Sequence, residues 1–182
     1  SYYRVMGVTL ETPYLQGALD YLKKRDIAFK IHAGGEAEGN ASNIFKADDH
    51  VLTAKYSVYG GIENFKNLWL WLLQRFCALE LEYNQPRQML WNGIYHPNAD
   101  KVYTSLEEYQ EKFCNPNYPT IGLIFYRNEW LLDNLAYQKA LVEECSKQKV
   151  NIIAVFSHGV KNPEMGAPGL EEAVNKYFIK DG

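Results

Sequence analysis

Several residue types and patterns are scarce in this chain, and each scarcity excludes a class of protein. The 182 residues contain three cysteines, Cys77, Cys114 and Cys145, which are far apart and form no CxxC pair. This arrangement favours free, mostly buried thiols over a disulfide framework or a zinc site. The four histidines are equally dispersed, so spacing predicts no metal site wholly within the chain.

Positive charge and long apolar runs are also in short supply. The net charge is −3 and the lysines are scattered, so nucleic acid is not an expected partner. No apolar run reaches the roughly 18 residues of a spanning helix, and the start lacks the regions of a signal peptide. We therefore expect no membrane span and a cytoplasmic location. Neither a GxGxxG fingerprint nor a GxxxxGK[ST] phosphate loop occurs, so no bound nucleotide is expected.

The residues that are present indicate a folded α/β protein. Apolar residues make up 47%, aromatic residues 14% and charged residues 23% of the chain, which is a globular composition. Short strand-like runs alternate with longer helical runs. We predict an α/β fold with open, mostly parallel sheets and flanking helices, made of Rossmann-like or flavodoxin-like βαβ modules.

Three regions are expected along the chain. Residues 1–82 form an α/β module, residues 83–119 an irregular crossing segment with one helix, and residues 120–182 a βαβ module with a terminal helix. In the first module, the patterns predict strands at 3–9, 27–32 and 50–56 and helices at 13–24, 41–46 and 62–76. Thr12 before Pro13 is a helix-start signal. The last helix of this module is apolar around nearly its whole circumference, which predicts burial on most sides.

The remaining elements follow from caps and apolar runs. Ser105 and Glu108 form a capping-box pattern that starts the helix of the crossing segment. The runs TIGLIFY and VNIIAVF are typical of parallel strands that are buried on both faces. A helical stretch over residues 131–148 connects them, and a last helix follows at about 169–178.

Polar residues stand at the predicted strand ends, where open parallel sheets bind ligands. Gly60 and Gly61 precede Glu63 and Asn64 at the start of the long helix. Glycines let a backbone approach a ligand, and free N–H groups of a first helical turn favour anions. The alternative is that the glycines only shape a turn and that Glu63 and Asn64 only complement the helix dipole.

Two more polar groups follow the last two strands. Tyr126 and Arg127 end TIGLIFY, and Ser157 and His158 end VNIIAVF. Arg127 can bind a carboxylate in a forked geometry, and His158 can act as an acid, a base or a ligand. The alternatives are a solvated surface charge and an ordinary loop histidine. His96, between an aromatic residue and a proline, is either rigidly aimed or a turn residue.

Three sequence blocks resemble a known family. AKYSVYGGIENFKNLWLWL, WNGIYHPNAD and YPTIGLIFYRNEWLLDN occur in this order within residues 50–158. Together they resemble the amino-terminal part of the large subunit of the cobaltochelatase and magnesium chelatase family. That resemblance implies a ligase that forms nitrogen–metal bonds, inserting a divalent metal into a tetrapyrrole in cobalamin or porphyrin biosynthesis. It also implies partner subunits of the AAA+ type, which use ATP that this chain does not bind.

The resemblance implies substrate-binding roles for Glu63, Asn64, His96, Tyr126 and Arg127. Metal insertion removes two pyrrolic protons, which requires a base, but none of these residues is assigned to that step. For each residue the alternative is support of the interface with the remainder of the large subunit. Cobalt is the favoured metal, with magnesium and nickel as alternatives.

Family members are far longer, so we expect this chain to be a fragment that is inactive alone. A hypothesis of another class is a non-catalytic α/β module that binds a small molecule or a protein partner.

Overall fold

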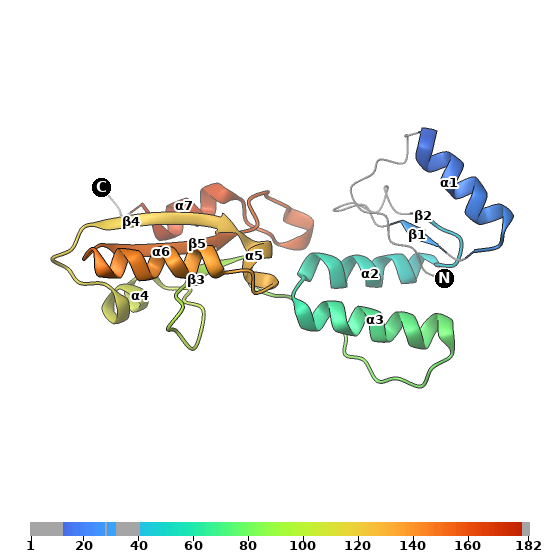
Figure 1. Cartoon of the computed structure of the whole chain (residues 1–182), viewed down its shortest axis with the longest axis horizontal. Coiled ribbons are helices and arrows are strands. Elements are labelled where there is room, and N and C mark those ends of the chain that lie inside the picture. The colour runs from blue at the N-terminus through green and yellow to red at the C-terminus, as the bar shows by residue number, and fades with distance from the viewer. Residues whose placement is uncertain (1–12, 28, 32–40, 180–182) are drawn as a thin grey trace. The chain divides into compact units, whose positions relative to one another are not determined.

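The computed structural model describes residues 13–27, 29–31 and 41–179, and the chain divides into two compact units, residues 1–88 and 89–182 (Figure 1). The strand predicted at residues 3–9 and the cap at Thr12 lie outside the described residues.

In its described residues, the first unit contains three helices and a small antiparallel sheet. Its elements are α1 (Pro13–Lys24), β1 (Lys30–Ile31), β2 (Ala41–Ser42), α2 (Ala47–Tyr59) and α3 (Ile62–Cys77). β1 and β2 pair antiparallel, with Lys30 opposite Ser42. α2 and α3 pack side by side (Figure 1). The helices predicted at 13–24 and 62–76 are confirmed.

The strand predicted at residues 50–56 is wrong, because this stretch lies within α2. The carboxylate of Asp49 accepts the backbone N–H of Lys46 at 2.9 Å, which caps the helix start. Asp49, Thr53 and Tyr56 are buried at spacings of four and three residues, which is a helical face. The β-branched residues Val51 and Thr53 raised the strand signal, but packing against α3 selects the helix.

The helix predicted at residues 41–46 is also wrong. Ser42 ends strand β2, and its hydroxyl oxygen accepts the backbone N–H groups of Ile44 and Phe45, each at 3.1 Å. The Asn43 side chain accepts the N–H of Phe29 at 2.9 Å. These side-chain oxygens bind backbone N–H groups and so compete with the hydrogen bonds of a helix. For this reason serine and asparagine favour turns.

The long helix α3 is not buried on most sides. Its buried residues are Asn64, Asn67, Trp71 and Leu72, whereas Trp69 is 45% exposed and Leu73 is 37% exposed. One face packs against α2 and the chain that returns along α3. Within the described residues, the opposite apolar face remains open to solvent.

The second unit is a three-stranded sheet with helices. Its elements are β3 (Asn92–Tyr95), α4 (Leu106–Phe113), β4 (Thr120–Tyr126), α5 (Arg127–Leu131), α6 (Ala136–Lys147), β5 (Asn151–Ser157), the 3-10 helix η2 (Pro163–Met165) and α7 (Leu170–Tyr177). The strand order is β3-β5-β4, with β5 parallel to β4 and antiparallel to β3. The predicted α/β class, the βαβ connection and the helices after Ser105 and Gly169 are therefore confirmed.

The core of this unit lies on both faces of β5, all of whose residues are buried. Ile153 and Val155 pack with residues of α4 and α7, while Ala154 and Phe156 pack with Phe125 and Leu135. Alternate residues of a strand point to opposite faces, so β5 joins two apolar layers. β3 was not predicted, because its four residues, NGIY, lie in a segment rich in turn residues.

The burial predicted for the run TIGLIFY is wrong. In β4 only Phe125 is buried, while Ile121 is 47% exposed and Ile124 is 39% exposed. β4 is an edge strand of the sheet that the structure describes. The apolar side chains of β4 are therefore less buried than its composition predicts.

The three cysteines are free, as expected, but they are not mostly buried. Cys77 is exposed, and Cys114 and Cys145 are half-buried. Exposure of Cys77 follows from its position at the end of α3.

Gly93→Ala should destabilise the second unit. A Cβ at Gly93 would clash with Cγ1 of the half-buried Val102 and lie 3.2 Å from the buried Phe156 ring, so these side chains must move. We expect the free energy of unfolding to fall by about 1–3 kcal/mol in urea denaturation. Gly17→Ala is the control, because nothing lies within 4 Å of the added carbon in helix α1. An unchanged Gly93→Ala midpoint would contradict this packing.

Candidate functional site

The sheet of the second unit brings several polar and aromatic residues to one edge. β4 and β5 are parallel and end together, with Tyr126 opposite Ser157. β3 runs the other way and begins at the same edge, with Asn92 opposite Ser157. Chain direction therefore places four residues at the same end of the strands: Trp91, Tyr126, Arg127 and His158. We call this end of the sheet, where β4 and β5 finish, the carboxyl edge. This is the position at which parallel sheets bind ligands.

Arg127 is the buried charge of the carboxyl edge. The residue is 2% exposed, and its Nε and Nη2 atoms donate to the carbonyl oxygens of Leu90 at 2.6 Å and Met89 at 3.1 Å. Its guanidinium carbon lies 4.3 Å from the centre of the Trp91 ring, a cation–π contact. Burial lowers the pKa of Arg127 to about 10, so the side chain stays charged at neutral pH.

His158 lies on the same indole. Its ring centre is 5.2 Å from that of Trp91, and its backbone N–H donates to the Trp91 carbonyl at 3.2 Å. Burial and the positive charge of Arg127 both lower the pKa of His158. A neutral imidazole at pH 7 can accept a proton or bind a metal ion.

Trp91 carries an unpaired polar atom. The residue is 8% exposed, and its buried Nε1–H has no hydrogen-bond partner within the described residues. Buried N–H groups without a partner are rare in folded proteins. The indole can therefore donate to a ligand oxygen or a water at the carboxyl edge. Tyr126, 73% exposed, offers an open aromatic ring at the same edge.

His96 lies elsewhere in the second unit. It follows Tyr95, whose partner on β5 is Ala154, so it is displaced along the strands from Ser157. Its ring stacks on Phe113 at 3.9 Å, and Nδ1 accepts the N–H of Asn98 at 3.2 Å. Burial lowers the pKa of His96. A cavity of about 110 Å³ lies between His96, Phe113 and residues at the start of β5, which is the opposite end of the strands from the carboxyl edge.

In the first unit, Gly60 and Gly61 do adopt positive φ angles of 68° and 89°. They follow helix α2, so the predicted position of Glu63 and Asn64 after a strand is wrong. Helix α2 extends through Tyr59, and the glycines form a corner between two helices. These two candidates therefore do not lie at a strand end.

Asn64 has a structural position in this corner. It is 4% exposed, and its Nδ2 donates to the carbonyl oxygens of Gly60 and Arg87, each at 2.7 Å. Its Oδ1 accepts the Arg87 N–H at 2.9 Å. The amide is therefore used to hold the returning chain, and a substrate-binding role for Asn64 stays a prediction.

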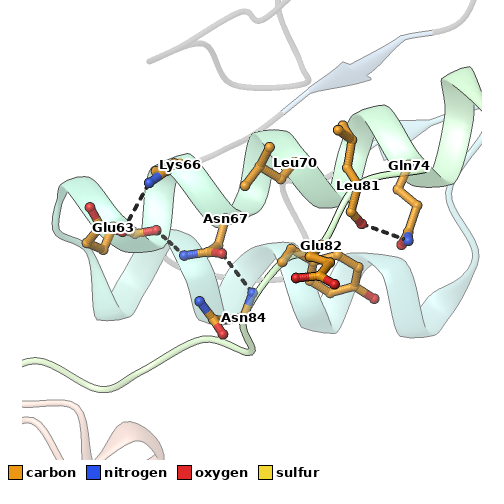
Figure 2. Close-up of a pocket in the computed structure, with 9 residues that line it drawn as sticks. Glu63, Lys66, Asn67, Leu70, Gln74, Leu81, Glu82 and Asn84 are labelled. Carbon is orange, nitrogen blue, oxygen red and sulfur yellow. Dashed lines mark hydrogen bonds and ion pairs between the residues drawn. The ribbon is translucent and has the colours of Figure 1, made fainter. Parts of the chain in front are cut away.

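Two further amides continue this attachment along α3. Asn67 accepts the N–H of Asn84 at 2.7 Å, and Gln74 donates to the Leu81 carbonyl at 2.9 Å (Figure 2). A groove of about 550 Å³ lies over these contacts. It is lined by Glu63, Lys66, Asn67, Leu70, Gln74, Leu81, Glu82, Tyr83 and Asn84. The exposed Glu63 carboxylate forms an ion pair of 3.8 Å with Lys66 at the groove.

The structure brings Tyr126 and Arg127 together and places His96 apart from them. Sequence reasoning missed Trp91, although its block WNGIYHPNAD was singled out. It also missed Asn67 and Gln74 on α3, although their spacing from the candidate Asn64 places all three amides on one helical face. In the described part of the chain, no three His, Cys, Asp or Glu residues could hold a metal ion. No described helix is long and apolar enough to cross a membrane.

Comparisons with known proteins identify the family. The CobN/Magnesium Chelatase family model matches residues 54–182, so this chain belongs to that family. An uncharacterized protein of Methanocaldococcus jannaschii is 38% identical over 141 residues, which are 74% of this chain and 11% of that protein. The magnesium-chelatase subunit ChlH of Oryza sativa subsp. indica is 24% identical over 132 residues, 63% of this chain and 10% of ChlH. The chain thus spans about a tenth of the length of the curated relatives it matches.

A solved structure shares the fold. The catalytic subunit of cobaltochelatase from Mycobacterium tuberculosis matches 97% of this chain and 14% of its own, with a TM-score of 0.56 and 17% identity. The family predicted from the three sequence blocks is confirmed.

Arg127→Met should raise the pKa of His158, because it removes a nearby positive charge that opposes imidazolium formation. The measurement is an NMR titration of the histidine rings. His96 is the internal control, since its pKa is lowered by burial alone. The electrostatic coupling is disproved if the pKa of His158 in the variant equals that in the parent chain.

Acid should destabilise the chain as the histidines titrate. The native pKa values of His96 and His158 lie below the ordinary 6.5, so the unfolded state binds more protons in that interval. The free energy of unfolding should therefore fall as pH decreases from 7 through 6.5 toward the native pKa values.

Urea unfolding at pH 7.5, 6.5 and 5.5 measures the slope. His158→Gln should make it shallower, because it removes one of the two histidines whose native pKa is lowered. An equal slope in the variant would show that His158 does not contribute.

Proposed function

We propose that this chain is a domain of the large, tetrapyrrole-binding subunit of a metal chelatase. The complete enzyme inserts a divalent metal ion into the ring and forms nitrogen–metal bonds. The observation that carries the proposal is the family match over residues 54–182. A relative that is itself a magnesium-chelatase subunit, and a fold shared with a cobaltochelatase catalytic subunit, support the same class.

The metal we propose is cobalt, delivered as a substrate, with magnesium and nickel as the alternatives. This choice follows only the resemblance of the block GIYHPNAD, and of its short spacing, to the cobalt branch of the family. ATP is used by AAA+ type partner subunits in a cytoplasmic assembly. The chain itself binds the ring and is inactive in insertion without the remainder of the large subunit.

The carboxyl edge has the chemistry to hold a flat ring with peripheral carboxylates. The exposed ring of Tyr126 can stack on the macrocycle, and the unpaired Nε1–H of Trp91 can donate to a carboxylate oxygen. The buried cation of Arg127 behind the indole favours negative charge at this edge. The bonds of Arg127 to two carbonyls make its contribution electrostatic rather than a forked clamp.

Proton removal is a separate requirement. The ring must lose two pyrrolic protons, so a group that is unprotonated at neutral pH is needed. His158, neutral and beside Trp91, meets the protonation requirement within this edge. We assign no insertion base, because that step belongs to the complete subunit.

The second function is a non-catalytic module that binds a partner protein or a small molecule. The observation that favours it is the use of Arg127 and Asn64 to bind backbone groups. In that function these candidates stabilise the module and its interface. The two functions differ in their response to a tetrapyrrole.

Titration with protoporphyrin or a metal-free corrinoid should quench tryptophan fluorescence at micromolar concentration. Trp91→Phe should remove most of the quenching, and Tyr126→Ala should weaken binding about tenfold, the size of one stacking contact. Trp69→Phe, which changes an exposed residue on α3, is the control and should bind normally. Equal loss of signal in both tryptophan variants, or no quenching in the parent chain, would favour the non-catalytic module.

A further inference from the structure

Strand β4 is poorly covered for its sequence. Its seven residues, TIGLIFY, contain no charged residue and no proline, and such runs are usual in parallel strands that are covered on both faces. Ile121 and Ile124 point to opposite faces, and both are more than a third exposed. Cover over these two isoleucines is therefore incomplete on both faces of β4.

Among the residues that the structure describes, the outer edge of β4 is also unpaired. The N–H of Asn151 donates to the carbonyl of Pro119 at 2.8 Å, which fixes the phase of the parallel ladder. In a parallel ladder, backbone groups of alternate residues point to the same neighbour. The N–H groups of Ile121, Leu123 and Phe125 therefore point toward β5, and those of Gly122, Ile124 and Tyr126 point away. No strand lies beyond β4 in the described part of the chain.

The opposite edge of the same sheet is closed. Beyond β3, Tyr103 exchanges two backbone hydrogen bonds with Ile94, at 2.8 and 3.1 Å. Proteins usually protect a bare edge with charges, proline, a bulge or a covering segment. β4 has a seven-residue register with β5 and neither charge nor proline, so its sequence is that of an interior strand.

We propose that β4 is an interior strand of the complete protein, paired along its outer edge with a strand from chelatase polypeptide outside these 182 residues. This proposal rests on the proposed function, because it takes the chain to be part of a large subunit. The matched relatives are about ten times longer than the segment they share with this chain, so such polypeptide is abundant in this family. A segment of the same polypeptide also pairs at a high effective concentration.

The added strand has a definite chemistry. It must present apolar side chains on both faces, to cover Ile121 on one side and Ile124 on the other. It must also lack a charge opposite the uncharged β4. Tyr126 is the last residue of β4, and its backbone N–H points away from β5. The added strand therefore extends the carboxyl edge beside the exposed Tyr126 ring.

Amide hydrogen exchange tests the proposal in the chain of 182 residues and in the complete gene product. In the 182-residue chain, NMR should show fast exchange at Gly122, Ile124 and Tyr126 and at least tenfold slower exchange at Ile121, Leu123 and Phe125. In the complete product, exchange followed by mass spectrometry should show about three additional protected amides in the peptide 120–126.

A charge at the edge provides the matched variant. Ile124→Lys should keep the circular dichroism spectrum of the 182-residue chain, because this side chain is already 39% exposed there. In the complete product it should restore fast exchange in the peptide 120–126. Tyr137→Lys, at a 59% exposed apolar position on α6, is the control and should leave this peptide protected.

Three results would overturn the proposal. They are equal exchange of the peptide in both proteins, a natural product no longer than this chain, and protection in the 182-residue chain that rises with its concentration. The last result would assign the edge to a second copy of the chain. Ring binding is measured independently by fluorescence, so normal quenching with an unprotected β4 would reject this proposal alone.

Discussion

The buried guanidinium of Arg127 is the interaction on which the carboxyl edge depends. A charge that is removed from water must be compensated, and here the compensation comes from the carbonyls of Met89 and Leu90 and the face of Trp91. The same contacts hold the start of β3 against the end of β4. They also place the indole where His158 packs on it, so one cation determines both the geometry and the electrostatics of the edge.

Much of the second unit could be predicted from sequence, because its signals are local and strong. Two continuous apolar runs around a helical stretch define the parallel pair, and the cap at Ser105 is confirmed by the 3.1 Å bond from the Glu108 N–H. In the first unit the signals are weak. The face of Asp49, Thr53 and Tyr56 becomes a helix only through packing, and short alternating stretches do not distinguish helix from strand there.

The candidate site could also be predicted only in part from the sequence. Chain direction predicts that Tyr126, Arg127 and His158 share an edge, since parallel strands end together. It cannot predict that Arg127 faces inward or that Trp91 joins it, because both depend on the unrecognised strand β3. Asn64 illustrates the same limit. A polar residue at a helix start can face a ligand or bind backbone groups of its own chain. The choice between these two roles depends on the returning chain at Arg87, which is distant in sequence.

The bare edge of β4 has a consequence for the domain in isolation. Six- or seven-residue segments with high β-propensity and no net charge readily stack into cross-β assemblies, and TIGLIFY is of this kind. Without a cover, concentrated solutions of the domain would be prone to fibril formation. A strand that pairs with β4 would then also protect the domain against amyloid-like stacking.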